Sequence, residues 1–442
     1  MQRVVGVLFL FSLPVVAQFR AGVQGVISDS TGAVVPNATV TLTNTETQRT
    51  QKTETTQEGF YGFFGLAPGT YTIEAGKTGF QKQVLSDIRI NAEEIQGRNL
   101  TLATGDVSQS ITVSDTSRPA LQTENGDVGK AITTEEVERL PQVGRNPYEL
   151  LRLTPGVFGD SARGGGGSAA NLPNTTGPGG SNFAIFQTEN QVPVAANGQR
   201  LSENSYRIDG VSVNSLGWGG AAVVTPNQES VKELRVTSGS YSAEIGRNAG
   251  AQIDVVSKNG TNQFHGSGVF KLDDPAFNAF NSYGGYNLPP ARVDQLFRQY
   301  AASVGGPVVK NRLFFFFSYE GLNNRSTNFV NSWIETPQFR QAVIAQRPDS
   351  MAAQILNSPN EIPRVVSVAN LPCPSGFAPG TCRQVTGGLD IGSIGGARGA
   401  YTTDTGGGLD GVPDVQFAQL ASPSSTQGNQ YNGRVDYTHN ND

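Results

Sequence analysis

Few side chains in this sequence could carry out catalysis, and they are scattered. The chain has two histidines, His265 and His439, which lie far apart in strand-like segments. No HExxH zinc helix, GxSxG nucleophile turn or nucleotide fingerprint is present. A GGGG run within residues 159–182 lacks the Gly-Lys-Ser/Thr of a phosphate loop, so this Gly/Ser/Asn-rich segment is interpreted as a flexible loop. We expect no enzyme, no catalytic residue and no cofactor.

The first residues, MQRVVGVLFLFSLPVVA, have the order of a secretory signal. Arg3 supplies a positive start, residues 4–16 form a short apolar stretch, and residues 15–17 give a small-residue exit. We predict a signal peptide over residues 1–17, in preference to a buried N-terminal strand. No later segment approaches the ~20 apolar residues that a membrane-crossing helix needs. The protein is therefore expected to leave the cytoplasm.

The residue types that bind metals are also poorly placed. Cys373 and Cys382 are the only cysteines. In an exported chain they favour a small disulfide loop, and without a nearby histidine they would make a poor zinc site. Asp404, Asp410 and Asp414 share one loop but lack the alternating oxygen ligands of a calcium loop, so a turn that caps a following helix is preferred. No metal site is predicted.

Composition indicates a mainly β protein. The 442 residues suggest about three domains. With 32 Lys and Arg against 37 Asp and Glu, the net charge of -5 gives no sign of nucleic-acid binding. The 54 glycines and frequent alternation of Thr, Val, Tyr and Phe favour strands and turns over long helices.

Residues 22–103 predict a small β-sandwich, because short alternating strands are separated by turn signals. Their layout, GxIxDxxGxxxxxAxVxLxN followed by GxYxFxxLxPGxY, resembles the carboxypeptidase regulatory-like domain. The resemblance implies a transthyretin-like sandwich without peptidase chemistry. The matching residues are Gly25, Ile27, Asp29, Gly32, Ala38, Val40, Leu42, Asn44, Gly59, Tyr61, Phe63, Leu66, Pro68, Gly69 and Tyr71.

Residues 114–258 differ in sequence pattern from the preceding segment and predict an α+β domain. Thr133 and Glu136 form a capping box that opens a short helix, TTEEVERLP, and Asn146-Pro147 starts a second helix, YELLRLTPGV. Four motifs follow in order: GRNPYELLRLTPGV, YRIDGV, AEIGRNAG and KNGTNQFHG. Together they resemble the plug domain of TonB-dependent outer-membrane receptors, and most of all the Oar-like subgroup, whose members begin with a regulatory-like sandwich.

The resemblance also marks individual residues of the plug. We expect its charged residues to form ion pairs among plug, loops and inner barrel wall, since unpaired buried charges are costly. Substrate contacts are assigned to residues 159–182 and the outer loops, with Trp218 as an aromatic contact. The plug motif residues are Arg145, Arg207, Asp209, Gly210, Glu244, Gly246 and Arg247.

The segment after residue 259 alternates as a membrane-barrel strand does, with one apolar and one polar face. RLFFFFSYEG, residues 312–321, is the clearest case. Leu313, Phe315, Phe317 and Tyr319 are predicted to face lipid. Phe314, Phe316, Ser318 and Glu320 are predicted to meet the plug low down and water higher up. The alternative is a fully buried core strand, in which Glu320 would need a partner.

Residues 260–442 therefore predict the N-terminal part of an outer-membrane β-barrel. GGPVVKNRLFFFFSYEG also resembles the second and third barrel strands of the Oar-like subgroup. The resemblance implies that residues 305–312 form a short periplasmic turn and residues 323–430 a long extracellular loop that contains both cysteines. Plugged transporters use about 22 strands and tolerate no lipid-exposed sheet edge, whereas this sequence supplies about four strands. We interpret it as the N-terminal portion of a longer receptor.

The resemblance implies active import of an unidentified extracellular ligand, with carbohydrate and peptide as the classes considered. The expected location is the outer membrane of a Gram-negative-type bacterium, in contact with its lipid, with the sandwich and plug entrance on the periplasmic side. The expected partner is TonB with its inner-membrane energising complex, bound by β-augmentation. The contact candidates are Ser110, Ile111, Thr112 and Val113, for which a linker or a last sandwich strand is an equal alternative. A surface or adhesion protein on the same barrel is the alternative function.

Overall fold

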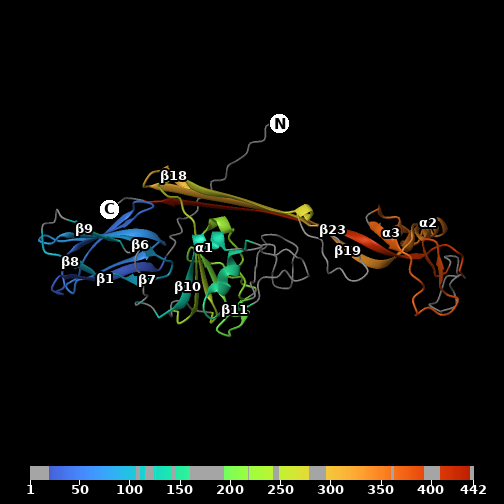
Figure 1. Cartoon of the computed structure of the whole chain (residues 1–442), viewed down its shortest axis with the longest axis horizontal. Coiled ribbons are helices and arrows are strands. Elements are labelled where there is room, and N and C mark those ends of the chain that lie inside the picture. Colours follow the sequence, from blue (N-terminus) through green and yellow to red (C-terminus); the bar gives the residue numbers. More distant parts are fainter. Residues whose placement is uncertain are drawn as a thin grey trace. The chain divides into compact units, whose positions relative to one another are not determined.

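The computed structural model of the chain is mainly β (Figure 1). It describes residues 19–105, 110–114, 124, 126–140, 145–159, 194–217, 219–241, 248–277, 295–359, 363–392 and 409–438. The chain divides into two compact units. The first comprises Met1–Lys271, Gln299–Leu322 and Thr426–Asp442, and the second comprises Leu272–Arg298 and Asn323–Ser425.

The first domain of unit one is the predicted β-sandwich. One sheet has the strand order β3-β2-β5-β6-β9, and the other has the order β4-β1-β7 with β8 also paired to β1. Along β5, Tyr71, Ile73 and Ala75 are buried and their neighbours are not, because successive side chains point to opposite faces. The strands are β1 (Ala21–Asp29), β2 (Thr39–Asn44), β3 (Thr50–Glu54), β4 (Phe60–Leu66), β5 (Gly69–Gly76), β6 (Lys82–Ile90), β7 (Ile95–Gly97), β8 (Leu100–Leu102) and β9 (Ser110–Ser114).

Strand β9 extends the sandwich beyond its predicted end at residue 103. It pairs in parallel with β6, with Lys82 opposite Ser110 and Ser86 opposite Ser114. It is the last strand in the sheet order, so one of its edges has no partner strand among the described residues. The alternative in which these residues form the last strand of the sandwich is therefore the arrangement observed.

The middle domain, residues 126–259, packs short helices against the sheet β10-β15-β16-β13-β14. The predicted capping box is present, because Thr133 caps the first helix and Glu136 returns to the Thr133 amide. The second predicted helix is a 3₁₀ helix, capped by Asn146. The elements are β10 (Val128–Thr133), α1 (Thr134–Arg139), η2 (Pro147–Leu153), β11 (Val157–Gly159), β12 (Val194–Ala196), η3 (Leu201–Glu203), β13 (Ser205–Ile208), β14 (Val211–Ser212), η4 (Gln228–Ser230), β15 (Val231–Gly239) and β16 (Gln252–Ser257).

The third sheet holds the strands predicted for the barrel. Its order is β17-β18-β19-β23-β22-β21, with β20 also paired to β23. The predicted turn over residues 305–312 is shorter in the structure, because β18 continues to Val309. The Arg312 amide bonds the Val309 carbonyl at 3.1 Å and closes a tight turn between β18 and β19. The strands are β17 (His265–Asp273), β18 (Gln295–Val309), β19 (Leu313–Glu335), β20 (Val365–Ala369), β21 (Arg383–Val385), β22 (Gly388–Asp390) and β23 (Val415–Tyr437).

Gly260 lies where the chain passes from the middle domain into this sheet. A Cβ on this residue would come within 2.3 Å of the Phe315 carbonyl oxygen and 2.7 Å of the Gly306 carbonyl oxygen. Real Cβ atoms do not approach backbone so closely, so the crossing requires glycine. The middle domain therefore connects to the sheet by chain that runs directly against the backbone of β18 and β19.

The second unit corrects the predicted extracellular loop of residues 323–430. β19 continues to Glu335 and β23 begins at Val415, so both ends of the predicted loop are strand. The strands persist because they pair with each other, and Trp333 packs edge-on against Phe417 with ring centroids 5.3 Å apart. Polar residues on both faces hid this extension in the sequence. The unit also contains η5 (Pro275–Phe277), α2 (Pro337–Gln346) and α3 (Met351–Leu356).

The expectation of a helix after Pro413 is wrong. Pro413 is followed by Asp414 and then by β23, whose first residue is Val415. The Asp414 amide bonds Leu389, and the Asp414 carbonyl accepts from Thr336 at 2.9 Å. These bonds to other segments keep the chain extended, so the aspartate belongs to a junction of loops and does not cap a helix.

Candidate functional site

The phenylalanine run lies on a strand whose two faces differ sharply. Phe314 and Phe316 are 1% and 2% exposed, whereas Phe317 is 44% exposed. Ser318 and Glu320 continue the buried face at 0% and 1%. The predicted alternation is therefore present. The upper part of the inward face meets protein rather than water, which is a correction.

The opposite face of the sheet in unit one is apolar and exposed. Tyr300, Tyr319 and Tyr431 form a row across β18, β19 and β23, with ring centroids 5.9 and 5.1 Å apart. Aromatic rows of this kind suit the boundary between a bilayer and water. Further exposed apolar side chains with the same alternation, on these strands and on or next to β17, include Phe264, Phe270, Val304, Val308, Phe317, Val435 and Tyr437.

On the inward face, Arg145 joins the middle domain to the sheet. Its Nη2 donates to Glu229 Oε1 at 2.6 Å, and its Nε lies 3.7 Å from Glu320 Oε1. Gln299 on β18 donates to the same Glu320 oxygen at 2.6 Å. Both carboxylates and Gln299 are buried. One arginine of the middle domain thus neutralises a carboxylate of its own and one of the sheet.

Glu229 also receives a bond from the sheet. The Ser267 hydroxyl of β17 donates to Glu229 Oε2, and the hydroxyls of Ser267 and Ser303 lie 2.6 Å apart. Burial acts to raise the pKa of Glu229, but the bonds from Ser267 and Arg145 outweigh it and the pKa is lowered. The carboxylate is therefore ionised at neutral pH inside the contact.

A second contact joins the middle domain to β23. Arg434 Nη1 donates to the Ser257 carbonyl at 3.1 Å and hydroxyl oxygen at 2.9 Å, and lies 3.4 Å from Asp209 Oδ1. Asp209 itself accepts from the Ser257 amide at 2.9 Å. The Asp209-Gly210 turn has φ values of 49° and 80°, which favour short polar residues and glycine. The IDG motif thus makes a turn that presents its carboxylate to the sheet.

The sequence-predicted plug residues separate into three groups. Arg145 and Asp209 contact the inward face of the sheet, as described above. Arg207 instead binds Asp254 within the middle domain and approaches the sandwich. Residues 160–182, Trp218, Glu244, Gly246 and Arg247 lie outside the described residues. The contact residues Glu229, Gln299 and Arg434 were missed, because no motif or spacing sets them apart from other polar residues.

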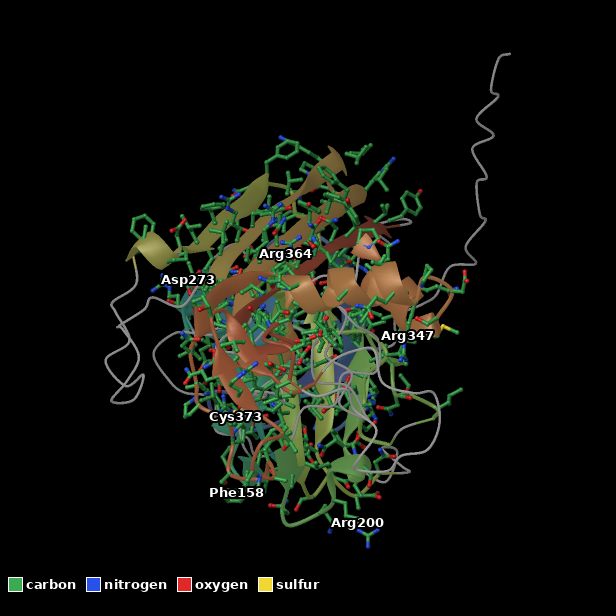
Figure 2. The ribbon with its side chains drawn as sticks, turned by 90° about the vertical axis from the view of Figure 1, so that its right-hand side faces the viewer. Phe158, Arg200, Asp273, Arg347, Arg364 and Cys373 are labelled. Atoms are coloured by element: carbon green, nitrogen blue, oxygen red, sulfur yellow. A yellow bond between two sulfur atoms is a disulfide. The ribbon has the colours of Figure 1, made fainter. Side chains whose placement is uncertain are left out.

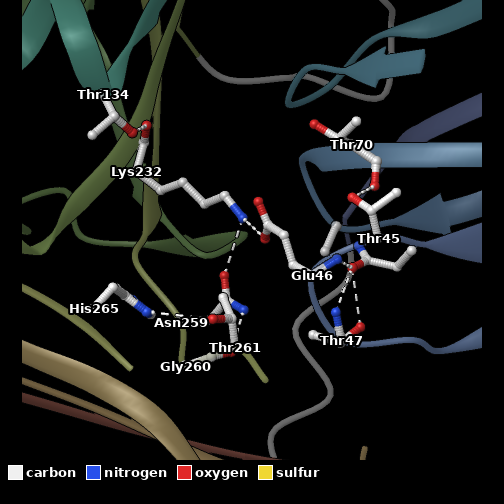
Figure 3. A network of polar contacts seen from close by, with 12 residues as sticks. Thr45, Glu46, Thr47, Thr70, Thr134, Lys232, Asn259, Gly260, Thr261 and His265 are labelled. Atoms are coloured by element: carbon white, nitrogen blue, oxygen red, sulfur yellow. Dashed lines mark hydrogen bonds and ion pairs between the residues drawn. The ribbon is translucent and has the colours of Figure 1, made fainter. Parts of the chain in front are cut away.

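The sandwich also contacts the middle domain through a polar network (Figure 3). Lys232 donates to Glu46 at 2.7 Å and to Asn259 at 3.2 Å, and so links the loop after β2 to the ends of β15 and β16. The Thr134 hydroxyl bonds the Lys232 carbonyl in the same network. The lysine therefore lies between the two domains with a partner on each side.

The remaining predicted site residues lie elsewhere. Cys373 is bonded to Cys382 in unit two, with an S–S distance of 1.96 Å, and is labelled in Figure 2. In unit one, Phe158 of β11 is exposed and, in Figure 2, lies at the same end of the middle domain as Arg200. The TonB candidates Ser110, Ile111, Thr112 and Val113 form β9.

Two further observations bear on the chemistry. Within the described ranges, no group of three His, Cys, Asp or Glu is placed to hold a metal ion. No helix in the same part of the chain is long and apolar enough to cross a membrane. What the site offers is a set of buried ion pairs between a domain and a sheet.

Comparison with known proteins identifies two domains. Residues 22–103 match the carboxypeptidase regulatory-like domain, and residues 256–442 match the outer membrane beta barrel domain. The chain therefore combines a carboxypeptidase regulatory-like domain with a C-terminal region that matches the outer membrane beta barrel domain. Both assignments agree with the sequence predictions.

One curated protein is similar to more than half of the chain. The chain is 27% identical over 262 residues to the TonB-dependent transporter Oar of Myxococcus xanthus, covering 58% of this chain and 22% of the relative. The order of the two matched domains and this relative are both similar to what the sequence motifs indicated.

Two solved structures are similar over a part of the chain. The siderophore receptor PirA from Acinetobacter baumannii is 18% identical, covering 48% of this chain and 30% of that one, with a TM-score of 0.29. The outer membrane transporter YddB from Escherichia coli is 16% identical, covering 46% and 27%, with a TM-score of 0.31. This chain spans less than a third of the length of each of these three relatives.

Proposed function

We propose that this protein is the N-terminal part of a TonB-dependent importer, in which the middle domain is the plug. One contact carries the proposal. Arg145 ties the middle domain to Glu320, on the face of β19 opposite the side chains suited to lipid. A domain held against the polar inner wall of a barrel would close its lumen. The Oar relative supports the same role.

The energised step is proposed to require TonB on the periplasmic side. β9 supports this, because it is an edge strand with Ile111 and Val113 each 45% exposed, and a free strand edge offers backbone groups to a partner strand. Its pairing with β6 leaves the other edge for TonB. Ligand contacts are proposed for the extracellular loops and for residues 159–182.

A binding measurement with TonB tests whether β9 is the contact strand. Ile111→Pro removes one backbone donor and should weaken binding of the purified periplasmic domain of TonB to the full chain in detergent at least tenfold. Ile111→Ala keeps the donor and serves as the control, with binding close to that of the unmodified chain. Unchanged binding by the proline variant would reject β9 as the contact.

Energy dependence tests the import itself. Cells that express the complete receptor should lose ligand uptake when the proton-motive force is collapsed, while ligand binding at the surface persists. Uptake unaffected by the collapse would overturn the proposal. A protein that binds ligand without any uptake would instead be a surface or adhesion protein.

A further inference from the structure

The turn between β6 and β7, residues 91–94, is buried against the middle domain. Ala92 is 1% exposed and Glu94 is 6% exposed, although both lie at the tip of a turn. The Ala92 amide donates to Glu233 Oε1 on β15 at 2.8 Å. A turn of the sandwich therefore reaches the sheet of the middle domain and makes a specific backbone contact with a buried carboxylate.

The sheet presents a row of alternating charges to this turn. Arg235 on β15 and Arg207 on β13 are both paired in register with Asp254 on β16, which lies between them. Arg207 binds Asp254 through Nε at 2.5 Å and Nη2 at 2.7 Å. Glu233 is two residues from Arg235 on the same strand, so its side chain lies on the same face.

The two glutamates of the turn occupy the ends of the row. Glu94 Oε2 lies 3.5 Å from Arg235 Nη1, and Glu93 Oε2 lies 3.7 Å from Arg207 Nη2. Arg20 of the sandwich also binds Glu93 at 2.6 Å. The contact thus brings several carboxylates and guanidinium groups of the two domains into one cluster.

Two of these carboxylates are hard to ionise in the contact. Burial raises the pKa of Glu233 to about 7, opposed by the Ala92 amide and by Arg89 and Arg235, and assisted by Glu94. Burial likewise raises the pKa of Asp254 to about 6, opposed by Arg207 and Arg20 and assisted by Glu93. Ion pairing offsets only part of the desolvation cost.

A small cavity gives Glu233 access to protons. Its volume is about 230 Å³, and it borders β5, β6, α1 and β15. The charged residues that line it are Glu46, Arg89, Glu135, Lys232 and Glu233. The Glu233 carboxylate therefore lies at the wall of an open pocket lined by polar residues of both domains.

We propose that this cluster is a proton-sensitive clasp between the sandwich and the middle domain, closed when Glu233 is protonated and loosened when it is ionised. Closing the contact takes up a proton, because the pKa of Glu233 in the contact lies above its ordinary value of 4.5. The clasp is therefore fully closed below that value and loosens as the pH rises through about 7. This inference concerns the link between the domains and does not depend on import.

Amide hydrogen exchange of the full chain in detergent tests the clasp. Exchange of residues 91–96 at pH 5 and pH 8 is compared after correction for the intrinsic dependence on pH. Protection of this turn should fall about tenfold or more between pH 5 and pH 8. Protection of β5, inside the sandwich core, should remain unchanged and shows that the domain stays folded. Equal protection of the turn at both pH values would overturn the proposal.

Two variants assign the effect. Glu233→Gln keeps an acceptor for the Ala92 amide but cannot ionise, so its turn should stay protected at pH 8. Glu46→Gln removes an ion pair between the same domains that lies outside the cluster, at Lys232, and should retain the full dependence on pH. A dependence on pH in Glu233→Gln as large as that of the unmodified chain would exclude Glu233 as the titrating residue. Loss of the dependence in Glu46→Gln would show that the contact at Lys232 is responsible instead.

Discussion

The middle domain makes two contacts through buried charges, and in each of them one carboxylate of the domain has a shifted pKa, with opposite directions in the two contacts. Against the sheet, the pKa of Glu229 is lowered, whereas against the sandwich, burial raises the pKa of Glu233 to about 7. Glu229 has Arg145 on one oxygen and Ser267 on the other, while Glu233 accepts a neutral backbone amide. A buried carboxylate stays charged where charged and hydroxyl donors serve both oxygens. The contact with the sheet keeps Glu229 ionised at neutral pH and is called the fixed contact below. The contact with the sandwich responds to protons and is called the responsive contact.

The largest effect should come from removing the arginine of the fixed contact. Arg145→Met leaves Glu229 and Glu320 buried without their cation, and we expect a loss of about 3–5 kcal/mol in the free energy of unfolding. Urea unfolding of the full chain in detergent measures it. Arg139→Met, at an exposed arginine with an i,i+4 partner, should change little. Adding Glu320→Gln to Arg145→Met should recover part of the loss; no recovery would argue against the Glu320 pair.

The responsive contact predicts a dependence on pH with a definite sign. The pKa of Glu233 in the folded chain lies above its ordinary 4.5, so its contribution to stability is present at low pH and disappears as pH rises through about 7. Relative to Glu233→Gln, the unmodified chain should lose about 2 kcal/mol between pH 5 and pH 8. Glu135→Gln, at an exposed carboxylate, is the control. Its free energy of unfolding should change between pH 5 and pH 8 by the same amount as that of the unmodified chain.

A smaller loss is expected at β23. Arg434→Gln removes the charged donor from the Ser257 carbonyl and from Asp209, and should cost about 2 kcal/mol. Amide exchange of β16 near Ser257 should rise in the variant and locate the effect. Lys310→Gln, at an exposed position in the turn between β18 and β19, should leave this exchange unchanged. Equal exchange in all three chains would mean that the arginine does not anchor the strand.

The smallest effect should come from the surface pair of the sandwich contact. Glu46→Gln breaks the bond to Lys232, but both side chains are partly exposed, so the cost should be less than about 1 kcal/mol. The same unfolding measurement applies. A loss as large as that of Arg145→Met would show that the two contacts do not differ in the way proposed here.

The sequence predicted the faces of strands better than their lengths. The alternation through Phe314, Phe316 and Phe317 could be predicted, because apolar residues on both faces of a strand require an apolar environment on each face. The extension of β19 to Glu335 was not readable, because paired strands in water tolerate polar residues on both faces. The capping box at Thr133 was predicted because its bonds are local in sequence.

The site was predicted only where a motif marked it. Arg145 and Asp209 fall in motifs. Their φ angles of 55° and 49° lie in the left-handed region, which few residue types favour, so the local sequence is restricted. Glu229, Glu233 and Arg434 look like ordinary polar residues, since their importance arises from partners 84 to 225 positions away or in another domain. Long-range pairing of this kind leaves no local pattern.

The crossing at Gly260 gives the two ends of the middle domain different mechanical roles. Residues 258–264, between β16 and β17, can span at most about 25 Å when fully extended, so this end is a short tether. β16 lies inside its sheet, between β15 and β13, so lengthening the tether would require separating strands on both sides. β10, at the other end of the domain, is an edge strand that has one neighbouring strand within the part of the chain that the structure describes. A force applied from the N-terminal side would therefore detach β10 first, while the C-terminal end of the domain stays tethered to the sheet of β17, β18 and β19.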